Sequence, residues 1–298
     1  MSFDSIYGHS TVKKQLTDIV NNNTLSHAYI FSGPMGVGKY DIAKAWAQMI
    51  TNGHTADIKE VTNENYCPSK KTASLSVDAV RNATADMYLK PFVADKSVYV
   101  IPHGETMSIP AQNALLKTFE EPPRYCVIII ITDNYEELLP TIRSRAVNIR
   151  FGKLTEQEIS GYLKDKGYKY SDVVTALADG SINKAVTLCE NGETLDLCEK
   201  TLGMLSDLFY KNGDAKYRLI NFLQQNKDSI NVILDTFIVF FQQSVLQLCE
   251  KNVTIPFRVP DGKTSARCIG HIERCKKALK SNVNYNMTVS ELVLELTQ

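Results

Sequence analysis

Ser32-Gly33-Pro34-Met35-Gly36-Val37-Gly38-Lys39-Tyr40 is the stretch that decides the fold. An apolar run, 28–31, precedes it and a helix-like segment, 41–50, follows it. A strand, a glycine-rich turn and a helix form the context of a P-loop, where backbone N–H groups, a lysine and the helix N-terminus hold phosphates. The spacing of Gly33, Gly38 and Lys39 fits this motif. The next residue, Tyr40, does not, because an active site has a Mg²⁺-binding Ser or Thr hydroxyl there.

Composition excludes several classes of protein. The 298 residues carry 33 Lys and Arg against 33 Asp and Glu, so no global basic field is available to hold nucleic acid. A module that binds DNA on its own is therefore disfavoured, and DNA contact would need a local patch or partner chains. The N-terminus lacks the pattern of a secretory signal, and the apolar runs are too short for a membrane span.

Cysteine usage predicts free thiols. The seven cysteines are scattered through the chain: Cys67, Cys126, Cys189, Cys198, Cys249, Cys268 and Cys275. No pair has the C-x2-C spacing, so neither a zinc site nor a disulfide framework is indicated. We expect buried thiols in a reducing cytoplasm.

Strand-like and helix-like segments alternate in the first half of the chain. The apolar patterns predict strands over 28–31, 96–101, 125–131 and 147–151, and helices over 10–20, 41–50, 76–89 and 109–121. Residues 51–74 are weakly patterned, and we expect them to be irregular. Strands joined by crossovers of a dozen residues or more predict a parallel α/β sheet.

Beyond about residue 154 the strand-like runs disappear. Thr155-Glu-Gln-Glu158 is typical of a capping box that opens a helix. A small helical unit continues to about residue 185, and longer helices such as 231–249 and 288–296 follow, with a loop over 256–265. Their apolar stripes predict a bundle core, and part of that surface is alternatively a subunit interface.

The second predicted strand ends unusually for a P-loop ATPase. Such a strand normally ends in Asp, often followed by Glu, which serve Mg²⁺ and the attacking water. Here it ends Ile101-Pro102-His103-Gly104-Glu105. We expect Glu105 to be a solvated loop residue, with a functional acid as the alternative. We expect no metal at His103, since no second ligand lies at a useful spacing.

Five further segments, taken in order, carry a family resemblance: Phe3–His9, Leu25–Tyr29, Gly33–Lys39, Asn113–Pro123 and Leu138–Arg145. The set resembles bacterial clamp-loader subunits of the AAA+ class, and within it the delta-prime type. The tail over 278–296 is similar as well, so the resemblance covers nearly the whole chain. The segments Leu115–Pro123 and Ile142–Arg145 are its most specific parts.

The resemblance implies an organisation and a role. It implies an AAA+ P-loop α/β domain (1–153), a small helical lid (154–194) and a helical collar (195–298) that joins five subunits. The partners would be motor subunits of the tau/gamma type, a delta-type subunit and, through the assembly, the sliding clamp and primed DNA. The delta-prime type is a stator, so the chain would be no enzyme by itself but a subunit of the DNA polymerase III holoenzyme. It would be cytoplasmic, at the replisome, without a membrane partner.

The resemblance also assigns a catalytic contribution in trans. The stator supplies an arginine from its Ser-Arg motif, here Ser144 and Arg145, to a neighbour's ATP site. Such arginine fingers stabilise charge on the transferred phosphate and are worth roughly 10³–10⁵ in rate. Arg143 is the nearest rival, and an ion pair or cap near the strand at 147 is the structural alternative for Arg145.

Departures from the family predict that hydrolysis in cis is absent. Only Cys67 lies where many members carry a four-cysteine zinc module, so we expect no zinc. The lid arginine that senses phosphate in motor subunits is replaced by Asn183, beside Lys184. We expect no required cofactor, with weak ATP or ADP binding as an option; the alternative function is an active motor subunit. The residues that would bind nucleotide are Gly33, Pro34, Gly36, Val37, Gly38, Lys39, Tyr40 and the sensor-like Thr132.

Overall fold

The computed structural model describes residues 3–70, 72, 74–210, 213–248, 260–281 and 283–297. The chain divides into two compact units, residues 1–159 and 160–298. Each unit is described by itself.

Unit 1 is built on a parallel sheet of five strands in the order β2-β3-β4-β1-β5. The strands are β1 (Ala28–Ser32), β2 (Ile58–Glu60), β3 (Ser97–Ile101), β4 (Cys126–Thr132) and β5 (Val147–Arg150). Every pairing is parallel, and Ser32 at the end of β1 lies beside Thr132 of β4 and Arg150 of β5. The predicted α/β fold class is confirmed. The carboxyl ends of the strands therefore meet at one edge.

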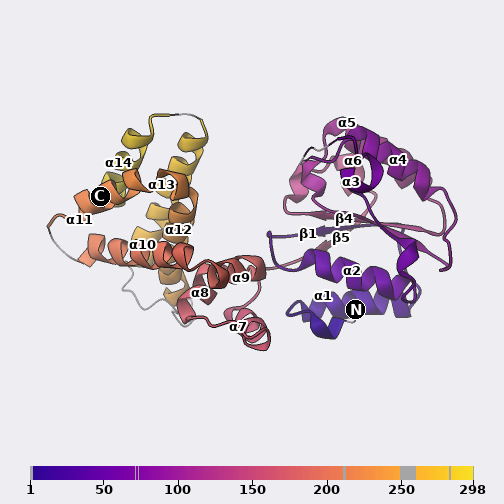
Figure 1. The fold of residues 1–298 in the computed structure, drawn as a ribbon, viewed down its shortest axis with the longest axis horizontal. Helices are drawn as coiled ribbons and strands as arrows, with labels where there is room; N and C mark the ends of the chain where they lie inside the picture. Colours follow the sequence, from indigo (N-terminus) through magenta and orange to yellow (C-terminus); the bar gives the residue numbers. More distant parts are fainter. Residues whose placement is uncertain are drawn as a thin grey trace. The chain divides into compact units, whose positions relative to one another are not determined.

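Helices cover both faces of the sheet (Figure 1). On one face lie α1 (Ser10–Asn21) and α2 (Lys39–Ile50); on the other lie α3 (Asn63–Tyr66), α4 (Val77–Met87), α5 (Ile109–Glu120) and α6 (Pro140–Arg143). Short 3-10 turns occupy Phe3–Ser5, Thr55–Asp57, Gly104–Thr106 and Tyr135–Glu137. Serine hydroxyls cap α4 and α5, which fixes where these helices begin.

The core forms two layers because the central strands are apolar on both sides. Every residue of β4 is buried, as expected of a central parallel strand. Its alternate side chains join different clusters: Ile128 and Ile130 pack with α4 and α5, whereas Ile129 and Ile131 pack with α1 and α2. The sheet is thereby held rigidly between the helices that flank it.

The expectation of an irregular segment over 51–74 is wrong in part. The segment contains a 3-10 turn, β2 and α3. Strand β2 has only three residues, two of them charged, and all three are half-buried at the edge of the sheet. So short and polar a strand carries no period-two signal, and its pairing with β3 defines it.

A buried carboxylate fixes the loop after α4. Asp57 is 1% exposed and accepts hydrogen bonds from the backbone N–H groups of Phe92, Val93 (2.9 Å) and Ala94 (2.7 Å). Burial alone would raise the pKa of Asp57, but the three N–H donors outweigh it, and the pKa is lowered. The charged carboxylate therefore holds this loop in place, with the side chain of Phe92 facing solvent.

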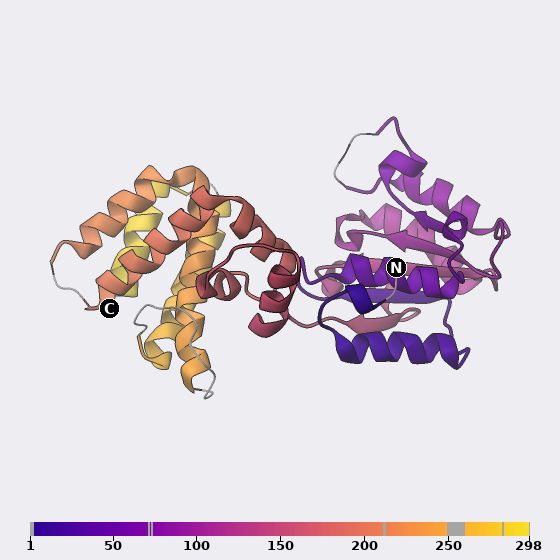
Figure 2. The same cartoon turned by 60° about the horizontal axis from the view of Figure 1, so that its bottom comes forward.

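Unit 2 is helical throughout its described residues, as predicted. It comprises α7 (Glu156–Asp165, which begins in unit 1), α8 (Asp172–Leu177), α9 (Ile182–Glu190), α10 (Gly192–Tyr210), α11 (Ala215–Gln225), a 3-10 turn (Lys227–Ser229), α12 (Ile230–Leu248), α13 (Gly262–Lys280) and α14 (Tyr285–Leu296). Helix α12 packs against α10 and α13, and α14 packs against α11 and α13 (Figure 2). The division between a lid and a collar at residue 194 stays a prediction.

Local signals at the helix ends of this half are largely confirmed. Thr155 and Glu158 form the predicted capping box, since each backbone N–H donates to the other side chain (2.8 and 3.2 Å). The predicted loop over 256–265 is shorter than expected, because Asp261 caps α13 and the helix begins at Gly262; residues 256–259 lie outside the described residues. No helix in the described ranges is long and apolar enough to cross a membrane.

Six cysteines fall within the described residues, and all are free. Cys126, Cys198, Cys268 and Cys275 are buried, whereas Cys67 and Cys189 are half-buried, so the expectation of buried thiols holds for four. Burial raises the pKa of Cys126 to about 12. Such a thiol stays protonated and unreactive. Cys249 lies outside the described residues.

Candidate functional site

The predicted nucleotide-binding residues do gather at the carboxyl edge of the sheet. The loop from Gly33 to Gly38 joins β1 to α2, and Thr132 is the last residue of the neighbouring strand β4. The N–H of Gly33 donates to the carbonyl of Thr132 (3.3 Å), which ties the loop to β4. In open parallel sheets this edge is where ligands bind.

The loop has a backbone that only glycine accommodates at two points. Gly33 has φ +151°, and a Cβ atom there would lie 2.3 Å from the carbonyl oxygen of Phe151. Gly38 has φ +95° and stands directly before α2. No side chain in the described part of the chain caps this helix, so the N–H groups of its first turn face the loop unpaired by a cap. Pro34, Gly36 and Val37 complete the predicted cradle.

The P-loop lysine is fully engaged within the chain. Lys39 is 4% exposed, and its Nζ donates to the carbonyl oxygens of Gly33 and Pro34 (both 2.6 Å). It also donates to Oδ1 of Asp133 (2.7 Å), the residue after β4. An ammonium has three N–H donors, and all three are thereby used.

Tyr40 does not face the phosphate cradle with its hydroxyl. The phenol donates to Oε2 of Glu60 (2.6 Å) at the end of β2, and the ammonium of Lys44 lies 4.5 Å from the ring centroid. Burial and the bond to Glu60 raise the pKa of Tyr40, which keeps the hydroxyl protonated. Together with Pro102 and His103 in place of an acid after β3, this donor set does not fit a nucleotide-bound Mg²⁺.

Thr132 is buried but turned to its own backbone. Its hydroxyl donates to the carbonyl of Asn134 (3.0 Å) and accepts from the N–H of the same residue (3.1 Å). This arrangement shapes the turn that places Asp133 against Lys39. Thr132 therefore supports the site indirectly in this conformation.

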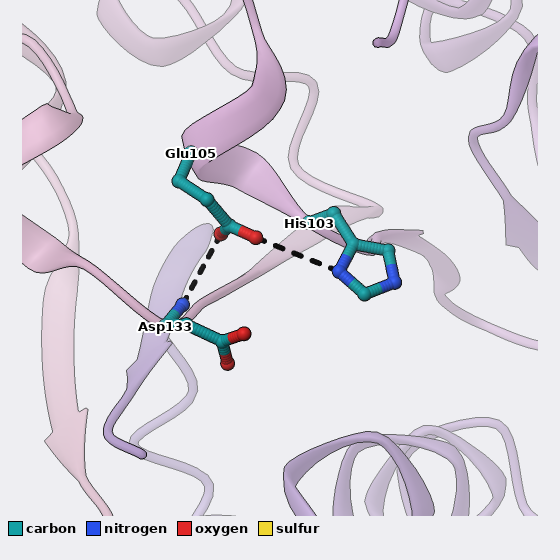
Figure 3. A group of neighbouring side chains, drawn as sticks. All are labelled: His103, Glu105 and Asp133. Carbon is teal, nitrogen blue, oxygen red and sulfur yellow. Dashed lines mark hydrogen bonds and ion pairs between the residues drawn. The ribbon is translucent and has the colours of Figure 1, made fainter. Parts of the chain in front are cut away.

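His103 and Glu105, which follow β3, lie close to Asp133, which follows β4 (Figure 3). Oε2 of Glu105 accepts the backbone N–H of Asp133 (3.1 Å), and its Oε1 lies 3.5 Å from Nδ1 of His103. The expectation of a solvated Glu105 is wrong, because this bond draws its side chain in until it is 17% exposed. The expectation that His103 lacks partner ligands is wrong as well, because β4 supplies Asp133 from a distant part of the sequence.

These three residues are the group in the described ranges whose ligand atoms could surround one cation, lying within 4.8 Å of one another. Asp133 already pairs with the ammonium of Lys39, and a cation would have to share that carboxylate with it. The arrangement explains the position of Asp133 more directly than it indicates a metal site.

The predicted finger, Arg145, lies on the surface of unit 1. Its guanidinium donates to Oε1 of Glu120 (3.0 Å), the last residue of α5, and to the carbonyl of Thr141 (3.1 Å). The side chains of Arg145 and Glu120 are 37% and 54% exposed. Ser144 is also exposed, and its hydroxyl donates to Thr141 (3.1 Å). The ion pair near β5 that formed the structural alternative is thus present, but at the surface.

Arg143 is more enclosed than Arg145. Its guanidinium forms an ion pair with Glu136 and lies 5.2 Å from the ring centroid of Tyr135. Its side chain is 22% exposed. Because its side chain is less exposed, Arg143 is the less available of the two arginines.

His9 also contacts the phosphate-binding loop, although the sequence analysis assigned it no role there. Its Nε2 donates to the carbonyl of Val37 in the loop (2.9 Å), and its ring packs edge-on against Phe151. Burial lowers the pKa of His9, so the ring is neutral near pH 7. The signal available in the sequence was the segment Phe3–His9, which belongs to the family resemblance but carries no chemistry of its own.

Asn183 and Lys184, the predicted lid positions, lie in the first turn of α9 in unit 2. The hydroxyl of Ser181 caps this turn by accepting the N–H of Lys184 (3.3 Å). Asn183 is exposed. An uncharged amide stands where the resemblance implies an arginine.

Residues 8–155 match the sequence profile of a family described as "DNA polymerase III, delta subunit". These residues form a delta-type domain of the DNA polymerase III clamp-loader family. The match spans the clamp-loader domain from just before α1 to the start of α7, and so includes the P-loop, the cluster at the end of β3 and the segment with Arg145.

Relatives from bacteria and archaea include DNA polymerase III subunits, which are named tau and gamma rather than delta. DNA polymerase III subunit tau of Bacillus subtilis is 30% identical over 284 residues, covering 82% of this chain and 50% of the relative. Subunit tau/gamma of Haemophilus influenzae is 28% identical (69% and 34%), and a replication factor C small subunit of Methanococcus maripaludis is 26% identical (62% and 59%). The chain thus spans about half the length, or less, of the first two relatives.

Two solved structures share the fold. A DNA polymerase III gamma subunit-related protein of Thermotoga maritima is 17% identical, with 95% of this chain and 98% of that chain covered and a TM-score of 0.50. A variant of Thermotoga maritima RuvB is 14% identical, with 98% and 89% covered and a TM-score of 0.51. At such identities the likeness concerns the fold alone.

Proposed function

We propose that the chain is a delta-prime-type stator of a bacterial clamp loader, which helps to place the sliding clamp on primed DNA. In this role it hydrolyses no ATP itself and donates Arg145 to the ATP site of a neighbouring motor subunit. The motor subunits would be of the tau/gamma type, as in the names of the relatives, and a delta-type subunit completes the assembly. The family domain over 8–155 supports the clamp-loader part of the proposal.

The observation that carries the finger role is the placement of Ser144 and Arg145. The guanidinium stands at the surface, and among the described residues its ion pair is with the exposed Glu120. Exposed pairs of this kind contribute only about 0–1 kcal/mol, so a neighbour's γ-phosphate can replace the carboxylate at little cost. A phosphate, like a carboxylate, can accept two parallel N–H bonds from an arginine, so it can take the place of Glu120.

Three features favour the absence of hydrolysis in cis. The Tyr40 hydroxyl is bonded to Glu60, Pro102 and His103 stand in place of the acid after β3, and Lys39 is bonded to Asp133. Each feature removes a different group on which phosphoryl transfer depends. Because all three features occur in one chain, they support a stator subunit more than a motor subunit in which a single residue has changed.

The test is the ATPase rate of the reassembled loader, stimulated by clamp and primed DNA. Arg145→Ala should remove most of the turnover of the one site that it serves, by roughly 10³-fold at that site. The total rate then falls by that site's share, while sizing shows an intact assembly. Arg81→Ala, an exposed arginine on α4 with an acidic neighbour, is the matched control and should leave the rate unchanged.

An unchanged rate for Arg145→Ala in an intact complex would sink the finger role. If the ATPase rate fell for Arg143→Ala and not for Arg145→Ala, Arg143 would be the finger. Either result is separable from a failure to assemble, which sizing detects.

The second candidate is a motor subunit, and the names of the relatives, tau and gamma, favour it. It requires that the chain alone turns over ATP in a Mg²⁺-dependent way. Robust turnover by the purified chain, abolished by Lys39→Ala, would establish the motor and overturn the stator.

A further inference from the structure

We propose that the loop Gly33–Lys39 is a latent polyphosphate site that the carboxylate of Asp133 keeps closed. The ligand class is a nucleoside diphosphate or triphosphate, or pyrophosphate itself. This inference concerns the chain's own loop and is independent of the role of Arg145 in a neighbour's site.

All N–H donors of the Lys39 ammonium are engaged within the chain. A P-loop lysine serves its ligand by donating N–H groups to phosphate oxygens. Here all three donors are taken, two by carbonyls of the loop and one by Asp133. A phosphate can gain this lysine only by displacing one of these acceptors.

The charge of Lys39 is neutralised at the site by Asp133. With Lys39 buried and paired to Asp133, the loop presents an ion pair of zero net charge rather than a free cation. Asp133 is further fixed by the bond from its N–H to Glu105, which places a second carboxylate nearby (Figure 3). Two carboxylates beside the cradle repel an incoming polyphosphate.

The backbone of the phosphate-binding loop and the start of α2 keep the features of the motif. The glycines give the loop the backbone conformation that the motif requires, with positive φ at Gly33, Gly36 and Gly38. Helix α2 has twelve residues, and its first-turn N–H groups have no side-chain cap. Loop, lysine and helix dipole are thus all present, and the internal carboxylate occupies the place of a ligand's charge.

The side chain of Tyr40 determines how binding should depend on Mg²⁺. The hydroxyl of Tyr40 is committed to Glu60, so no side chain of the loop is free to hold a Mg²⁺ bound to the nucleotide. Once opened, the site should bind the polyphosphate about equally with Mg²⁺ and with EDTA. An active P-loop ATPase would show a clear preference for the magnesium complex.

The experiment is calorimetric titration of the full chain with pyrophosphate and with ADP. Asp133→Ala removes the carboxylate, and Asp133→Asn keeps its shape without the charge. Both should bind at least about tenfold more tightly than the wild type, in EDTA as in Mg²⁺. Adding Lys39→Ala to either variant should abolish the gain. Thermal unfolding confirms that each variant is folded.

The matched control is Asp78→Asn. Asp78 is also an aspartate paired with a lysine, Lys70, but it lies on α4, on the opposite face of the sheet from α2. This variant changes the net charge equally and should bind no better than the wild type. No gain for folded Asp133 variants, an equal gain for Asp78→Asn, or a gain that survives Lys39→Ala would each overturn the proposal.

Discussion

Lys39 and Arg145 are both paired with a carboxylate, and burial separates their roles. Lys39 is almost completely enclosed and has three acceptors, so removing any one of them leaves a buried charge short of a partner. Arg145 is exposed, and its pair with Glu120 is weak because water and salt screen it. The buried lysine is therefore part of the fold, whereas the exposed arginine can exchange partners.

The same reasoning predicts a pH dependence at His9. Burial lowers the pKa of this ring in the folded chain, so the unfolded chain binds a proton first as the solution is acidified. The contribution of His9 to stability is complete above the unfolded pKa of about 6.5 and declines as the pH falls towards the folded value. The free energy of unfolding should thus fall between about pH 7.5 and 5.5.

Urea denaturation across this pH range measures the effect. In His9→Gln, whose amide can still donate to Val37, the fall should be smaller than in the wild type. An equally steep fall in the variant would show that other groups, such as the half-buried ring of His27, account for it.

Residue types and spacing were enough to identify the P-loop, but not the state of its side chains. Asp133 lies 94 positions after Lys39 in the sequence, so no local sequence pattern predicts their ion pair. The direction of the Tyr40 hydroxyl depends on Glu60, which belongs to a strand that the sequence did not reveal. Side-chain partners at the carboxyl edge are set by strand order, which the sequence leaves open.

At the scale of elements, the long apolar segments were predictable and the short polar ones were not. β4 stands out because seven consecutive buried residues match a central parallel strand, and α5 because a serine cap and two prolines bound it. β2 and α6 have three and four residues and escape any periodicity argument. Tertiary pairing alone defines them.

The loop after α4 gives a prediction for an element without regular structure. Asp57→Ala would leave three backbone N–H groups without their acceptor, and we expect a loss of about 2–4 kcal/mol in the free energy of unfolding. Asp57→Asn, which keeps one acceptor oxygen, should lose less. Urea denaturation of both variants is the measurement.

Asp95→Ala provides the comparison for the same loop. Asp95 is exposed and lies just beyond the segment that Asp57 holds, so its removal should change stability by no more than about 0.5 kcal/mol. Equal losses for the two aspartates would contradict the anchoring role.

At the scale of the whole molecule, the two units have cores of their own. Phe240 is fully buried in α12, in contact with Phe241 and within unit 2. Phe240→Ala should cost about 3–5 kcal/mol. Hydrogen exchange followed by mass spectrometry should show protection lost in unit 2 and kept in β1, β3 and β4.

Tyr217→Ala, at an exposed position of α11, is the control and should leave exchange unchanged in both units. Protection lost to the same extent in the sheet of unit 1 would mean that the units unfold as one, against the division at residue 159.

The position of β1 in the sheet also has a consequence for how the chain is made. β1 is flanked by β4 and β5, and Ala28 pairs with Ile128 while Tyr29 pairs with Val147. The ribosome adds about a hundred residues or more between β1 and either neighbour, which takes about 5–20 s at the usual rates of translation. During that interval the apolar β1 segment has no partner on the ribosome. The nascent chain is therefore most exposed to misassociation and to chaperone capture until β4, which ends at Thr132, leaves the exit tunnel.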